Sequence, residues 1–257
     1  MRALTATAFL VAVAYPLISH KGHAIGGISG SKVLVPSADT VGRKRFEAEP
    51  FFVFEFTGDE KETKRYDAGV RLTYGFMENL EAGLSYFFFG AEHGEAFHVS
   101  SKGFGDTELG VKYKLNREED FSLAAVSGMR FPVVENSPWV AEPAGLVLTK
   151  NLSDRLSLDA GLVAGFSFGN HNPRTLHVIS QAGLGYFVTP SFQPVVEIAY
   201  KMENKNNEVD ASIITLTGGF TVLFSKVFTL VVGVSPDIVA AGTERHISCS
   251  VALTMLF

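Results

Sequence analysis

The chain ends on the stretch Ile247-Ser248-Cys249-Ser250-Val251-Ala252-Leu253-Thr254-Met255-Leu256-Phe257, which decides the fold. From Ile247 onward every second residue is apolar, and the residues between are mostly small or hydroxylated. Side chains of a β-strand alternate between two faces, so the stretch predicts a strand with one apolar face and one face of mostly small or hydroxylated residues. The predicted strand runs to the final residue, which is aromatic.

The same alternation recurs along most of the chain. In residues 66–76 and 80–88, which flank the short turn 77–79, one face is apolar and the other carries glycine beside charge. A soluble β-sandwich would bury its apolar face and show polar side chains to water. Glycine beside charge fits a crowded polar lumen better. About twelve segments follow this pattern: 46–56, 66–76, 80–88, 107–115, 121–131, 144–149, 156–166, 178–186, 192–201, 212–222, 227–235 and 247–257.

These segments predict an all-β fold, an antiparallel transmembrane β-barrel of about 12 strands. An even strand number is usual for single-chain bacterial barrels, and a barrel needs an apolar exterior but no long apolar run. The composition agrees, since mean hydropathy is +0.19 although 19% of the residues are charged. The terminal strand with Phe257 resembles the insertion signal that the barrel assembly machinery reads. Outer-membrane lipid is then the expected surroundings.

The amino terminus predicts export. Residues 1–24 begin with a positive charge at Arg2, continue through an apolar run too short to span a bilayer, and end with small residues around His23. We therefore expect a signal peptide, cleaved after Ala24. Residues 25–40 are rich in glycine and serine and predict a periplasmic lead-in, and residues 41–257 form the predicted barrel.

Connection lengths predict the orientation. Tight turns at 77–79, 116–120, 151–154, 189–191 and 224–226 alternate with longer, polar connections at 90–103, 132–142, 169–175, 202–208 and 236–244. Short turns of such barrels face the periplasm and long loops face outside. Both termini are then expected on the periplasmic side of a Gram-negative outer membrane.

Charge and composition restrict the partners. The net charge of −5 argues against nucleic acid as a partner. The single cysteine, Cys249, excludes an intrachain disulfide, and no cofactor is implied. His93 and His98 lie near acidic residues in one connection, an arrangement that is more often solvated than metal-binding, so no metal is predicted.

One stretch carries a family resemblance. Residues 103–115 read GFGDTELGVKYKL and resemble a recurring G-x-G-D-x-x-L-G-x-K-Y motif. The motif is typical of an outer-membrane barrel family named for the meta-pathway of phenol degradation and described as transporter-like. The resemblance implies an envelope protein that passes small, often aromatic, molecules. The matching residues are Gly103, Gly105, Asp106, Leu109, Gly110, Lys112 and Tyr113.

Charged residues on the minor faces are the candidate pathway residues. They carry both signs, which argues against strong ion selectivity and favours a narrow, partly obstructed path. The cations Arg71, Lys112, Lys114 and Arg130 lie on neighbouring strands and predict one basic patch, which faces Glu47, Glu81, Glu108 and Glu197. The alternative is a salt-bridged packing that fills the lumen. The candidates are Arg71, Glu81, Glu108, Lys112, Lys114, Arg130, Asp159 and Glu197.

The expected function is a channel or transporter-like barrel for passive passage of a small, hydrophobic or aromatic solute. A structural or surface-binding barrel without transport is the alternative. An outer-membrane lipid hydrolase is disfavoured because no third partner joins His246 and Ser248. We therefore expect no enzyme and assign no catalytic residue.

Overall fold

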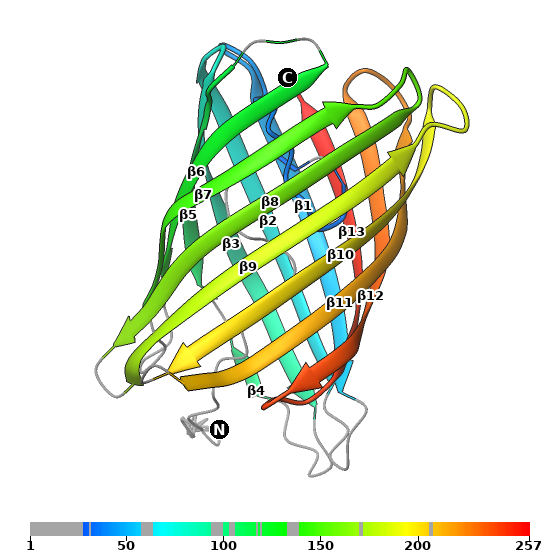
Figure 1. Ribbon diagram of the computed structural model, residues 1–257. Coiled ribbons are helices and arrows are strands. Elements are labelled where there is room, and N and C mark those ends of the chain that lie inside the picture. The colour runs from blue at the N-terminus through cyan, green and yellow to red at the C-terminus, as the bar shows by residue number, and fades with distance from the viewer. Residues whose placement is uncertain are drawn as a thin grey trace, which may run out of the picture.

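The strands close into a barrel (Figure 1). The computed structural model describes residues 28–30, 32–57, 64–93, 100–102, 106–116, 118, 120–132, 139–169, 172–205 and 208–257. The strands are β1 (Phe46–Thr57), β2 (Lys64–Met77), β3 (Leu80–His93), β4 (Ser100–Lys102), β5 (Thr107–Lys114), β6 (Phe121–Phe131), β7 (Trp139–Asn151), β8 (Leu156–Gly169), β9 (Asn172–Tyr186), β10 (Phe192–Lys205), β11 (Glu208–Leu223), β12 (Phe228–Ala241) and β13 (His246–Leu256).

All pairings in the barrel are antiparallel. Strand β3 pairs with β2 on one side, and on the other with β5 and then with the short β4, so β4 and β5 share one position in the wall. The first strand pairs with the last. The result is a closed 12-stranded antiparallel barrel, which confirms the predicted fold class and strand number.

The seam between β1 and β13 depends on the last residue. The Phe257 amide donates to the Phe46 carbonyl at 2.8 Å, and the Phe46 amide donates to the Phe257 carbonyl at 3.1 Å. The two rings lie with their centroids 6.5 Å apart. Phe257 therefore closes the ladder as well as ending the chain.

Deletion of Phe257 is expected to lower the yield of folded barrel, because it removes the two hydrogen bonds to Phe46 and the terminal aromatic side chain. The fraction of heat-modifiable protein in outer-membrane extracts measures this. Phe224→Ala is a matched control, because Phe224 is an equally exposed phenylalanine in a turn. A normal yield after the deletion would remove the role assigned to Phe257 in assembly.

The outer face of the wall is apolar. Leu109, Leu162 and Leu184 are 45%, 53% and 47% exposed, and Leu84 lies in register with Leu109. Such an exposed apolar surface is suited to lipid rather than water. The inner face carries the glycine and charged residues, as the alternation predicted.

The two ends of the barrel differ. The end that holds Phe257 also holds the turns at 78–79, 152–155, 188–191 and 224–227, and we name it the short-turn end (Figure 1, top). At the opposite end, three connections predicted as longer loops are shorter than expected, because the strands extend into them. Strand β8 runs to Gly169 and β9 begins at Asn172, and β10 and β11 likewise extend into 202–208. Strand β12 runs to Ala241, within the predicted loop 236–244.

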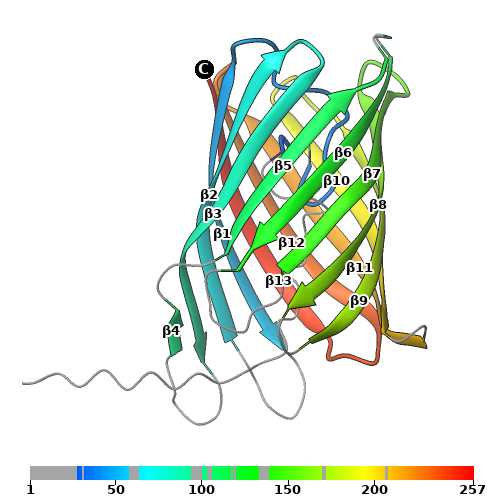
Figure 2. The ribbon, with the colours of Figure 1, turned by 90° about the vertical axis from the view of Figure 1, so that its left-hand side faces the viewer.

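Residues 28–30 and 32–41, which we name the inner segment, lie inside the barrel (Figure 2). Ile28, Val35 and Ala38 are at most 2% exposed. The expectation that residues 25–40 form a periplasmic lead-in is therefore corrected for the described part of this range. The physical reason is that its apolar side chains and backbone amides find partners on the inner wall.

Candidate functional site

The lumen and the segment that fills it form the candidate site. Lys112 on β5 is the largest of its fully buried charged side chains. Its ammonium group lies 3.0 Å from a carboxylate oxygen of Glu81 on β3. The backbone carbonyl oxygens of Ser29, Ser37 and Asp39 lie 2.7–3.1 Å from this ammonium group, and the Ser29 hydroxyl oxygen lies 2.7 Å from it. The three N–H groups of the lysine are shared among these acceptors and Glu81. Lys112 therefore fastens both ends of the inner segment to the wall.

Glu81 completes this anchor from the neighbouring strand. One carboxylate oxygen accepts from the Ser29 amide at 2.9 Å, and the other accepts from the Val41 amide at 2.8 Å. The buried charge pair is thus satisfied by hydrogen bonds on both sides, as a stable buried pair requires.

A second anchor uses a cation from the inner segment itself. Lys32 forms a fully buried ion pair with Asp159 on β8. The other Asp159 oxygen accepts from the Thr149 hydroxyl at 2.5 Å, and the Thr149 hydroxyl oxygen in turn accepts from the Ala38 amide at 2.9 Å. The side chains of Ser37 and Thr149 also meet, with their oxygens 3.3 Å apart.

Glu197 on β10 forms the third anchor. Its two carboxylate oxygens accept from the backbone amides of Val33 and Leu34 at 2.9 and 2.7 Å. A turn in which Gly30 bridges to Pro36 brings these amides across the lumen. The carboxylate therefore satisfies backbone donors that would otherwise be buried without partners.

Lys114 makes a looser contact near the short-turn end. Its ammonium group and the Ser122 hydroxyl both donate to Asp39 at 2.7 Å. Partial burial raises the pKa of the Asp39 carboxyl, but these hydrogen bonds and the charges of Lys114 and Lys112 outweigh burial, so its pKa lies below the ordinary value.

The remaining predicted pathway cations are each matched with an acid. Arg71 lies 3.2 Å from Glu49, and Arg130 lies 2.6 Å from Glu108. The single basic patch predicted from the sequence is therefore wrong. Arg71, Lys112 and Arg130 instead sit beside a carboxylate on a neighbouring strand, which is the arrangement that stabilises cross-strand charges.

Wall glycines make room for the inner segment. A Cβ atom at Gly233 on β12 would lie 2.5 Å from a methyl carbon of Val33, and one at Gly219 on β11 would lie 2.8 Å from the other. These distances are shorter than any normal contact. The glycines on the minor faces thus allow the segment to pack directly on the wall backbone.

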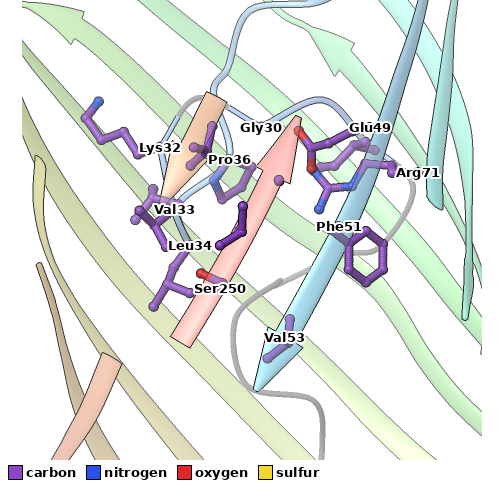
Figure 3. A pocket seen from close by; sticks show the side chains of 15 residues that line it. Gly30, Lys32, Val33, Leu34, Pro36, Glu49, Phe51, Val53, Arg71 and Ser250 are labelled. Carbon is purple, nitrogen blue, oxygen red and sulfur yellow. The ribbon is translucent and has the colours of Figure 1, made fainter. Parts of the chain in front are cut away.

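A cavity remains between the inner segment and strands β1, β2, β12 and β13 (Figure 3). Its lining combines polar and apolar surface, and its apolar residues include Leu34 and Pro36 from the segment and Phe51 from β1. Arg71 and Glu49 also line it and are its charged groups on the wall.

The family-like motif divides between the two faces of β5. Asp106, Gly110 and Lys112 are buried, whereas Leu109 and Tyr113 are exposed on the outer face. Gly103 and Gly105 lie outside the described residues. The buried positions serve the lumen, and Lys112 is the one that carries an anchor.

Several residues of the site were not anticipated from the sequence. Ser29, Lys32, Ser37 and Asp39 lie in a stretch without periodicity, so no pattern marked them. Thr149 was recognised only as part of a strand.

His98 and the side chain of His93 lie outside the described residues. Within the described ranges no group of three or more His, Cys, Asp or Glu side chains is placed to hold a metal ion. In the same part of the chain, no helix is long and apolar enough to cross a membrane.

The geometry is that of an outer-membrane β-barrel, and comparisons with solved structures agree. The COG4313 outer membrane channel from Pseudomonas putida F1 matches with a TM-score of 0.69 and 14% identity, over 86% of this chain and 98% of that one. The NanC porin matches with a TM-score of 0.55 and 8% identity, over 81% and 98%. The KdgM porin matches with a TM-score of 0.50 and 14% identity, over 80% and 98%. This fold places the protein in the Gram-negative outer membrane.

The chain belongs to the family described as putative MetA-pathway of phenol degradation, whose profile matches residues 42–244. The match confirms the resemblance seen in the motif at residues 103–115. The inner segment lies entirely before the matched range. No match was found among curated protein sequences.

Proposed function

We propose that the protein is a passive outer-membrane channel for small, weakly polar or aromatic solutes, with the inner segment as a fixed constriction. The short-turn end faces the periplasm in this proposal. The observation that carries it is a polar, charge-paired lumen inside an apolar wall, with space left beside the segment (Figure 3). The similarity to a solved outer membrane channel supports the channel role, and the family description supports the solute class.

The constriction is fixed because its anchors are buried and connected. Removing one partner of a buried ion pair costs about 3–5 kcal/mol. Lys112 and Asp159 each hold the segment through such a pair. Solute therefore passes between the segment and strands β13, β1 and β2, rather than by expelling the segment.

A disulfide across the anchor tests this path. Ser37→Cys with Thr149→Cys, in a Cys249→Ala background, joins two positions whose hydroxyl oxygens are 3.3 Å apart. Planar-bilayer conductance is expected to be the same in the oxidised and reduced forms, because the segment need not move. Deletion of residues 28–40 is expected to raise conductance several-fold in the same measurement. A lower conductance on oxidation would mean that the segment must move.

A structural barrel without transport is the second candidate, favoured by the complete burial of Lys112. The same recordings separate the two. If neither the wild type nor the deletion variant conducts, the structural role replaces the transport proposal.

A further inference from the structure

The polar anchors of the inner segment lie on the part of the wall that runs from β3 to β10. Its anchors are Lys112 and Glu81 on β5 and β3, Asp159 on β8, and Glu197 on β10. Val33 packs on the glycines of β11 and β12. The cavity in Figure 3 lies on the remaining side, toward β13, β1 and β2.

Two phenylalanine rings occupy this side of the inner wall. Phe51 on β1, Gly69 on β2 and Phe87 on β3 lie in register across three neighbouring strands. The rings of Phe51 and Phe87 meet edge to face over the glycine, with centroids 5.2 Å apart. A Cβ atom at Gly69 would lie 2.5 Å from the Phe51 ring, so only glycine permits this contact. Phe87 thereby fixes the orientation of Phe51.

A donor and an acceptor lie beside this aromatic surface. Arg71 and Glu49 pair at 3.2 Å and both line the cavity with Phe51. The second Glu49 oxygen accepts from the Thr254 hydroxyl at 2.7 Å, which holds the carboxylate in place. The cavity therefore has the oriented ring of Phe51 on its lining and, beside it, the Arg71–Glu49 ion pair, which carries no net charge.

We propose that this cavity is a solute subsite for a neutral aromatic ring that bears a hydroxyl group, with Phe51 as the ring contact. A hydroxyl group both donates and accepts, so it matches Glu49 and Arg71 together. A carboxylate on the solute is disfavoured because it would meet Glu49. Phe87 is a positioning residue that acts through Phe51. The inference rests on the proposed channel function.

Binding to purified wild-type and variant protein tests the subsite, with saturation-transfer NMR and phenol as the probe. Phe51→Leu, which retains an apolar side chain but loses the ring, is expected to weaken phenol binding about fivefold, since aromatic contacts exceed area burial alone. Phe87→Leu is expected to weaken it less. Phe52→Leu and Phe88→Leu are matched controls, because both side chains are exposed on the outer face. Any partition of phenol into detergent is the same for all four variants.

Two further probes examine the chemistry. Cyclohexanol keeps the hydroxyl group but lacks the planar ring, and anisole keeps the ring but cannot donate a hydrogen bond. Both are expected to bind at least threefold more weakly than phenol to the wild type. Equal phenol binding by the Phe51 and Phe52 variants, both folded by heat modifiability, would overturn the subsite. Conductance of the wild type without solute is measured separately, so failure of the subsite and failure of the channel proposal are distinguishable.

Discussion

Lys112→Glu is expected to release the inner segment and to destabilise the barrel by about 3–5 kcal/mol, the cost of breaking a buried ion pair. The new carboxylate would face Glu81 and the backbone carbonyls of the inner segment, which now accept hydrogen bonds from the lysine. Guanidinium unfolding in lipid vesicles measures the loss of stability. A cysteine-specific reagent on Ser37→Cys, in a Cys249→Ala background, measures the release.

Lys114→Glu is the matched control, because Lys114 lies two residues along the same strand. Its partner Asp39 has a half-exposed side chain, and such exposed pairs contribute about 0–1 kcal/mol. The Ser37→Cys thiol should therefore react quickly only in the Lys112 variant. If it stayed inert there and the two variants unfolded alike, Lys112 would not anchor the segment. The complete burial of Lys112 favours, at this position, the salt-bridged packing that was the alternative to a pathway role.

The wall was predictable because the membrane imposes a strict pattern. Leu162 faces outward and Asp159 inward, as the alternation along residues 156–166 required. A shift of one residue would move every charge to the lipid face, so the register is strongly determined. Because the strands are regular, the alternation in the sequence determines which side chains face the lipid and which face the lumen.

The ion pairs were predictable in principle from the same register. Glu81 lies directly opposite Lys112, Glu108 opposite Arg130, and Glu49 opposite Arg71. Aligning neighbouring segments from their short turns brings these residues together. The basic patch was predicted incorrectly because the cations were taken as one group that faces the acids. Pairing each cation with its own cross-strand neighbour would have separated them.

The inner segment could not be predicted in this way. It has no periodicity, and its partners are distant in sequence, as the bond from Ser29 to Glu81 shows. One signal was available. Asp159 and Glu197 have no opposite charge directly across from them on either neighbouring strand. Lys32 of the inner segment pairs with Asp159, and two backbone amides of the segment donate to Glu197.

Leu162→Arg is expected to destabilise the barrel by about 2–4 kcal/mol, the cost of a cation on the lipid face near the bilayer midplane. Leu162 lies at the middle of β8 and its side chain is 53% exposed on the outer wall. Arginine at Leu84, Leu109 or Leu184 is expected to act in the same direction. Guanidinium unfolding in vesicles measures the free energy of each variant.

Leu152→Arg is the control for depth. Leu152 is 48% exposed, close to the value for Leu162, but it lies in a turn at the short-turn end. An arginine near the interface costs only about 0–1 kcal/mol because its side chain reaches water. If only the exposure of the side chain mattered, both variants would lose the same free energy of unfolding. A membrane around the barrel requires a larger loss of stability for Leu162→Arg than for Leu152→Arg. Equal losses would therefore mean that the apolar face does not contact the hydrocarbon core.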